Sequence, residues 1–162
     1  MPQAADIADL GCGPAGDGAI FAHTGHRVAG IDRSAGRLDI AASVLPGRVA
    51  QADLRRLPLA SASLDGVWCC AALLHVPHED TMAALAEMRR VLKPAGHLAL
   101  VTALGNHARL EPVPYAPATQ RWFFYRRPGE LHEQLRTARL QAVMTTRQPG
   151  SRDWLKILAR AA

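Results

Sequence analysis

The chain lacks the features of a secreted, membrane-bound or metal-binding protein. Only three of its 162 residues are cysteines, and Cys12, Cys69 and Cys70 do not have the spacing of metal ligands. So few thiols favour a reduced, cytoplasmic protein without a metal site. No basic segment followed by a long apolar run begins the chain, and no apolar run is long enough to cross a bilayer. We therefore expect a soluble protein with no membrane partner.

Lysine is scarce as well. The net charge of +5 comes almost entirely from arginine, because Lys93 and Lys156 are the only lysines. These arginines are scattered along the chain, so a nucleic-acid partner is not expected. The exception is the run RWFFYRR at 121–127, where basic and aromatic residues interleave. We expect a lid over a substrate there, and a strip that stacks single-stranded RNA is the rival interpretation.

The most informative segment is a glycine-rich turn at residues 9–16, DLGCGPAG, between an apolar run and a helix-like run. Glycines at 11, 13 and 16 let the backbone turn sharply and approach a ligand closely. Asp32, an acid about 20 residues further on, can bind two ribose hydroxyls. The pattern predicts a pocket for an adenosine-bearing cofactor. The same glycines also satisfy the fingerprint of nicotinamide and flavin enzymes.

Three further segments bear on which cofactor binds. Asp9 lies two residues before the first glycine, where a buried carboxylate suits an ammonium group. Asp53 ends a third short strand, where it can accept a hydrogen bond from an adenine amino group. A fourth apolar run leads into His75 and Pro77. In this order, from about Asp6 to the C-terminus, the chain resembles a class I S-adenosylmethionine-dependent methyltransferase of the small-molecule type.

The resemblance implies S-adenosylmethionine as the cofactor. In that family the glycine loop holds the methionine end, the acid after the second strand binds the ribose, and the acid after the third strand meets the adenine. Ala15 departs from the pattern, since many members have a third glycine there. The cofactor-binding residues that the resemblance implies are Asp9, Gly11, Cys12, Gly13, Asp32, Arg33, Asp53, Leu54 and Cys70.

Alternating strand-like and helix-like runs predict an α/β fold in one domain, residues 1–162. The resemblance implies a Rossmann-like, mostly parallel sheet of seven strands with an antiparallel C-terminal hairpin. Helices are expected at 17–24, 35–44, 79–92 and 128–137. Strands are expected near 7–10, 28–31, 49–52, 66–71, 97–102, 140–146 and 154–159.

Residues 104–127 read as an insertion over the reaction site, because ligands of open α/β sheets bind outside the carboxyl ends of the strands. The stretch 106–117 is too rich in proline for regular structure. Arg121, Trp122 and Tyr125 are the candidate substrate residues. His75 is the candidate general base, and a histidine that only hydrogen-bonds the turn before Pro77 is the alternative.

These observations predict methyl transfer from S-adenosylmethionine to a small-molecule acceptor at oxygen or nitrogen. The alternatives are an NAD(P)-binding oxidoreductase and a non-catalytic member of the fold that binds a nucleotide-like ligand. Only five residues precede Asp6, so the helices that family members carry there are short or missing. We expect a partly bare sheet face at Ile7, Leu10 and Val67, and therefore either a homodimer or a piece of a longer parent.

Overall fold

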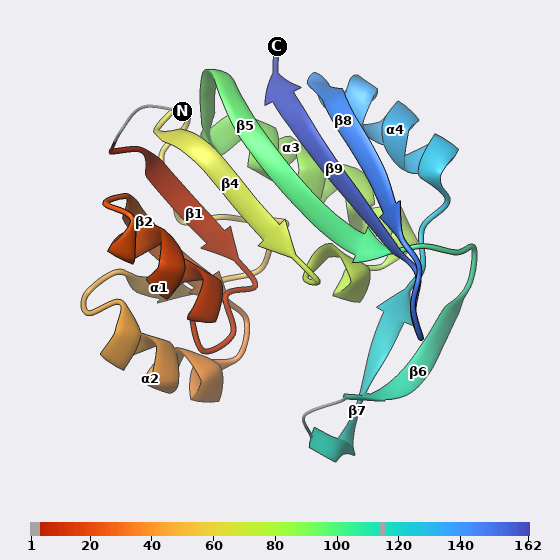
Figure 1. The fold of residues 1–162 in the computed structure, drawn as a ribbon, viewed down its shortest axis with the longest axis horizontal. Helices are drawn as coiled ribbons and strands as arrows, with labels where there is room; N and C mark the ends of the chain where they lie inside the picture. The colour runs from red at the N-terminus through yellow and green to blue at the C-terminus, as the bar shows by residue number, and fades with distance from the viewer. Residues whose placement is uncertain (1–3, 114–115) are drawn as a thin grey trace.

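A computed structural model describes residues 4–113 and 116–162, and its centre is a seven-stranded sheet (Figure 1). The strand order is β3-β2-β1-β4-β5-β9-β8. The first five strands in this order run parallel, and β9 and β8 run antiparallel to their neighbours. The strands are β1 (Asp6–Leu10), β2 (Arg27–Asp32), β3 (Val49–Gln51), β4 (Leu64–Cys70), β5 (Leu92–Ala103), β8 (Leu140–Gln148) and β9 (Trp154–Ala161). The expected Rossmann-like sheet with its C-terminal hairpin is confirmed.

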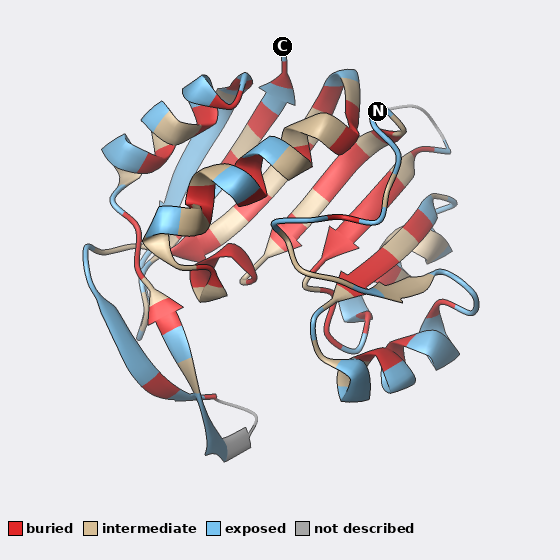
Figure 2. Ribbon diagram, turned by 180° about the vertical axis from the view of Figure 1, so that it is seen from behind, coloured by how far each residue is buried: buried red, intermediate tan, exposed pale blue. Residues whose placement is uncertain are grey.

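Helices cover the two faces of the sheet unequally (Figures 1 and 2). On one face, α1 (Gly16–His23) and α2 (Ala35–Val44) pack against β2 around Val28 and Leu38. On the other, α3 (Thr81–Val91) and α4 (Pro128–Thr137) pack on the main core. Two short 3-10 turns, η1 (Leu73–His75) and η2 (His78–Asp80), precede α3. All four expected helices are present.

The main core lies between the sheet and α3. Apolar residues at helical spacing, Ala84, Leu85, Met88 and Val91, are fully buried there, so the amphipathic pattern of α3 places one stripe against the strands. Figure 1 draws no helix in front of β5, β9 and β8, and on β8 the side chain of Met144 is 56% exposed.

The sheet residues that we expected to be bare are covered. Ile7, Leu10 and Val67 are only 3%, 0% and 2% exposed. Leu10 and Val67 belong to the main core, on the face that α3 covers. The expectation of a bare face at these residues is therefore wrong: helices later in the chain cover Leu10 and Val67, and Ile7 is buried as well. The homodimer stays a prediction.

The segment after β5 contradicts the expectation of irregular structure. It forms an antiparallel hairpin of β6 (Ala108–Val113) and β7 (Ala116–Phe124), which projects away from the sheet (Figures 1 and 2). The prediction extended over residues 114 and 115, which lie outside the described residues. Pro112 is tolerated because both strands of a two-stranded hairpin are edges, where a missing N–H costs little. The register shifts directly after Pro112.

Candidate functional site

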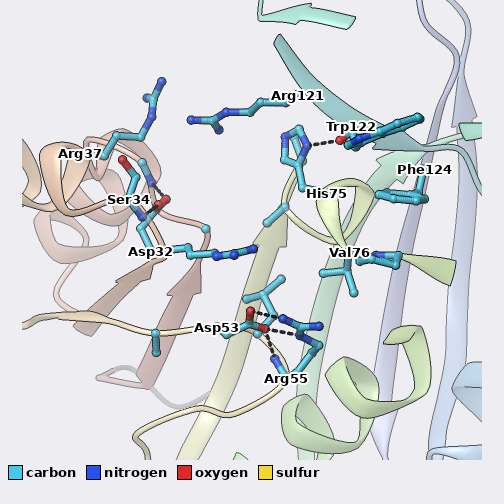
Figure 3. A pocket seen from close by; sticks show the side chains of 18 residues that line it. Asp32, Ser34, Arg37, Asp53, Arg55, His75, Val76, Arg121, Trp122 and Phe124 are labelled. Carbon is cyan, nitrogen blue, oxygen red and sulfur yellow. Dashed lines mark hydrogen bonds and ion pairs between the residues drawn. The ribbon is translucent and has the colours of Figure 1, made fainter. Parts of the chain in front are cut away.

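A cavity of about 620 Å³ lies at the carboxyl ends of β1, β2, β3 and β4. One wall is formed by the loops after these strands, and the opposite wall by η1 and β7 (Figure 3). Parallel strands collect their carboxyl ends at one edge, which is where open α/β sheets bind ligands. The lining consists of Gly11, Gly13, Asp32, Arg33, Ser34, Arg37, Ala52, Asp53, Leu54, Arg55, Ala71, Ala72, His75, Val76, Pro77, Arg121, Trp122 and Phe124.

The glycine loop needs glycine for two separate reasons. Gly11 and Gly13 have φ values of 72° and 54°, in the left-handed region that other residues rarely adopt. A Cβ on Gly11 would also lie 2.3 Å from the Cβ of Ala72, so the loop after β1 and the loop after β4 touch there. Gly16 has open space around it. Ala15 adopts a φ of 64°, so the alanine at the family's third glycine carries backbone strain.

Asp32, at the end of β2, joins the glycine loop to α2. Its carboxylate accepts hydrogen bonds from the backbone N–H of Gly13 at 2.8 Å and of Ser34 at 2.8 Å. An ionised carboxylate has about four lone-pair sites. Both oxygens can therefore still accept hydroxyl groups from a ligand in the cavity, while the backbone holds the carboxylate in place.

Asp53 has a partner that the sequence analysis missed. Arg55 donates to both of its carboxylate oxygens, at 2.8 and 2.7 Å, and also to Asp80 at 2.5 Å. The Arg55 guanidinium lowers the pKa of Asp53 to about 2. Asp53 is thus a fixed anion on the cavity wall, tied through Arg55 to the turn that carries Asp80.

Asp9, Cys12 and Cys70 lie outside the cavity lining. Asp9 is 3% exposed and accepts a hydrogen bond from the backbone N–H of Gly18 at 3.1 Å. Burial, with the charge of Asp17, raises the pKa of Asp9 to about 7. Asp9 supports the first turn of α1 from within, Cys12 is buried, and the lining after β4 begins at Ala71 rather than at Cys70.

His75 is fixed by the hairpin. Its Nδ1 lies 2.9 Å from the backbone oxygen of Trp122, and the Phe123 ring makes an edge contact with the imidazole at 4.7 Å between centroids. A carbonyl oxygen can only accept, so Nδ1 carries the proton and Nε2 is the basic nitrogen. Burial lowers the pKa of His75, and the charges of Arg121 and Arg152 lower it further. A neutral imidazole with one free lone pair therefore lines the cavity.

Aromatic residues at the end of β7, and Tyr125 directly after it, lie on two different sides. Trp122 and Phe124 line the cavity, whereas Phe123 and Tyr125 are buried in a small core with Leu74. Tyr125 is 5% exposed and donates its hydroxyl to Glu111 at 2.6 Å. Tyr125, which we expected to contact substrate, lies outside the cavity lining and fastens the base of the hairpin. The two-residue period of a strand separates the two pairs, but it can be applied only once 116–124 is recognised as a strand.

Arg126 ties the end of the hairpin to the turn that carries His75. Its guanidinium donates to the carbonyl oxygens of Leu73 and Val76, at 2.9 and 2.7 Å, and to Oγ1 of Thr81 at 2.7 Å. The side chain is buried without a carboxylate partner among the described residues, and burial lowers its pKa to about 10. The two carbonyls flank His75, so this contact holds the turn in shape.

The comparisons with known proteins agree with this geometry. The family model of the methyltransferase domain matches residues 8–100, and the chain belongs to that family. Over 102 residues, 58% of this chain, it is 35% identical to the methyltransferase GfsG of Streptomyces halstedii and covers 36% of that protein. It is 34% identical over 99 residues, 60% of this chain, to a malonyl-[acyl-carrier protein] O-methyltransferase of Enterobacter lignolyticus, of which it covers 39%. The chain thus spans less than half the length of these relatives.

Solved structures share the fold. A S-adenosylmethionine-dependent methyltransferase from Methanosarcina mazei superposes with a TM-score of 0.87 at 20% identity, over 99% of this chain and 94% of that one. The 1,6-didemethyltoxoflavin-N1-methyltransferase of Burkholderia thailandensis, solved with S-adenosylhomocysteine, has a TM-score of 0.79 at 24% identity. The match covers 99% of this chain and 72% of that one. In the part of this chain that the structure describes, no helix has the length and apolar character of a membrane span, and no group of side chains resembles a metal site.

Proposed function

We propose that the chain binds S-adenosylmethionine in this cavity and catalyses transfer of its methyl group to the oxygen or nitrogen of a small-molecule acceptor. One observation carries the proposal: in a chain of the methyltransferase domain family, Gly11, Gly13, Asp32 and Asp53 all line one cavity. The family match also favours this function over a nicotinamide-dependent oxidoreductase, for which the glycine loop was the only support.

The cavity fits the cofactor in three respects. The positive φ angles of Gly11 and Gly13 keep the loop free of side chains, so backbone can approach the methionine end closely. Asp32 has lone pairs left for two ribose hydroxyls. Leu54 and the fixed Asp53 line the wall where adenine would lie. When bound, S-adenosylmethionine supplies a methyl group activated by its sulfonium sulfur.

His75 would act as the general base. The acceptor oxygen or nitrogen gains the methyl carbon and loses its proton to Nε2 of His75, while the electron pair of the broken bond stays on sulfur. Because Nδ1 donates to the Trp122 carbonyl, Nε2 is the basic nitrogen of a side chain that lines the cavity. Holding the reactants in line supplies up to ~7–11 kcal/mol of the barrier, and a positioned base contributes about 10²–10⁴-fold.

The hairpin would serve as the lid, within the segment 104–127. Arg121, Trp122 and Phe124 of β7 line the cavity opposite the glycine loop, so β7 provides the wall against which an acceptor lies. The relatives include proteins named as O-methyltransferases, and the structural neighbour from Burkholderia methylates a nitrogen. Either atom therefore suits the proposal.

Calorimetry followed by a methyl-transfer assay tests the function. S-adenosylhomocysteine is expected to bind and to raise the melting temperature, and NAD is not. Labelled S-adenosylmethionine is then incubated with a metabolite extract, with the Asp32→Ala variant as the blank. Binding without any labelled product would favour a non-catalytic member of the fold. Stabilisation by NAD alone would overturn the proposal.

A further inference from the structure

Arginine dominates the charged lining of the cavity, with four arginines against two carboxylates. Arg37 of α2 and Arg121 of β7 extend from opposite walls over the same side of the cavity, and His75 lies beside Arg121 (Figure 3). Cations brought together in a half-buried cleft repel one another, and an anion between them relieves that repulsion.

The nearby carboxylates are already engaged elsewhere. Asp32 accepts from two backbone N–H groups, and in the proposed function its remaining lone pairs take the ribose hydroxyls. Asp53 is held by Arg55. Glu111 stands directly opposite Arg121 in the hairpin register, and it would be the natural partner. Its carboxylate instead binds Arg109, Arg152 and the hydroxyl of Tyr125.

Arg121 is therefore left without a partner among the described residues. Within residues 4–113 and 116–162 its guanidinium makes no hydrogen bond or ion pair, although the side chain is half-buried on the cavity wall. A guanidinium presents a planar fork of donors that matches a carboxylate or phosphate. Partial burial strengthens such a pairing relative to a fully exposed one.

We propose that the acceptor carries an anionic group, a carboxylate or a phosphate, that binds the guanidinium of Arg121 on the His75 side of the cavity, with Arg37 on the opposite wall. The nucleophilic oxygen or nitrogen of the same molecule then lies at Nε2 of His75. This inference rests on the proposed function and narrows its acceptor from any small molecule to an anionic one.

The charges around His75 affect its strength as a base. The positive charge of Arg121 faces His75 from β7, Arg152 adds to it from the loop before β9, and Asp32 opposes both from β2. An anion bound at Arg121 offsets part of the positive charge and raises the pKa of His75. The histidine then becomes a stronger base when the acceptor is in place.

This coupling can be measured without knowing the acceptor. The His75 imidazole is followed by NMR in histidine-labelled protein saturated with S-adenosylhomocysteine, and its signal is assigned by its loss in His75→Gln. The protein is titrated with inorganic phosphate, and separately with malonate, against potassium chloride of equal ionic strength. We expect phosphate, malonate or both to raise the pKa of His75. The anion that does so at the lower concentration identifies the preferred group.

Three variants make the result specific to Arg121. Arg121→Gln is expected to weaken anion binding about ten- to hundredfold, as the loss of charge-assisted hydrogen bonds implies, and to raise the pKa of His75 before any anion is added. Arg121→Lys keeps the charge without the fork and should be intermediate. Arg147→Gln, an exposed position on β8 outside the cavity, is the matched control and should behave like the wild type.

Two outcomes would overturn the inference: no response to either anion in the wild type, or an equal response in Arg121→Gln. Calorimetry with S-adenosylhomocysteine on each variant shows that the protein is folded and separates the two proposals. If the wild type fails to bind S-adenosylhomocysteine, the proposed function fails. If it binds S-adenosylhomocysteine but neither anion, only the acceptor class fails.

Discussion

Two walls face each other across the cavity, and they are built by different means. The wall of strand ends, from β1 to β4, is shaped mainly by backbone: glycines with positive φ and a carboxylate held by N–H groups. The wall formed by β7 is shaped by side chains, whose positions depend on Arg126, Tyr125 and Glu111. A site can thus combine a wall set by local sequence with one set by distant pairings.

This difference agrees with the proposed roles of the two walls, in which the strand-end wall binds the cofactor and the β7 wall contacts the acceptor. Enzymes that bind the same cofactor can share a cofactor-binding loop shaped by backbone. A wall shaped by side chains can differ between enzymes, so that each binds a different acceptor. If this division is right, substitutions in the strand-end wall should change cofactor binding, and substitutions in the β7 wall or at η1 should change turnover alone. Asp32→Ala and His75→Ala test this division, and two further experiments test the stability of the strand-end wall; they follow from the largest expected effect to the smallest.

Asp32→Ala is expected to reduce cofactor affinity most. It removes two charge-assisted hydrogen bonds of ~1.5–3 kcal/mol each to the ribose, and it also releases the Gly13 and Ser34 N–H groups. Calorimetry with S-adenosylhomocysteine should detect no binding. Asp39→Ala, on an exposed position of α2, is the matched control. If Asp32→Ala bound S-adenosylhomocysteine about as tightly as the wild type, the proposal that Asp32 binds the ribose would be wrong.

His75→Ala should lower turnover about 10²–10⁴-fold and leave cofactor affinity unchanged. The base acts when neutral, so kcat/KM, which reports the free enzyme, should rise with pH through a pKa below the ordinary value of histidine and then level off, because burial lowers the pKa of His75. His23→Ala, exposed on α1, is the control. Turnover within a few-fold of the wild type would mean that the acceptor arrives already deprotonated.

Gly11→Ala should destabilise the fold, and Gly16→Ala should not. The left-handed φ at Gly11 costs any other residue about 1–2 kcal/mol, and the contact with Ala72 adds overpacking of about 1–3 kcal/mol. Gly16 begins α1 in open space, where alanine is neutral or gains up to about 1 kcal/mol. Urea unfolding compares the two directly, and equal midpoints would show that the loop is not as tight as described.

Asp9→Asn should stabilise the empty protein at neutral pH. The folded carboxyl has its pKa raised by burial from 3.8 to about 7, so its contribution to stability is full below pH 4 and is lost as pH rises through 7. Asparagine does not ionise, so the free energy of unfolding of the variant should exceed that of the wild type by roughly 1–3 kcal/mol above pH 7. Unfolding at pH 5 and at pH 8 measures it. A variant less stable than the wild type at both values would contradict the account.

The strand-end wall could be predicted closely from the sequence, because an acid or glycine that ends an apolar strand must lie at the edge where parallel strands collect. Asp32, Asp53 and Gly11 illustrate this. The β7 wall could not be predicted, because the prolines of 106–117 indicate irregular structure. The hairpin tolerates them because its strands are edge strands. Without the strand, Tyr125 was grouped with Trp122 although the two point to opposite sides. The pairing of Asp53 with Arg55 and Asp80 depends on tertiary contact and gave no local signal.

The hydrogen bond between His75 and the Trp122 carbonyl also bears on the timing of the reaction. The strand that we propose as the lid also holds the imidazole in the tautomer with a free Nε2. If the hairpin swings outward, the ring loses that restraint, and either ring nitrogen can then carry the proton. A closed hairpin would then keep the imidazole in the tautomer that can accept the proton, and the opening that admits an acceptor or releases a product would end that control.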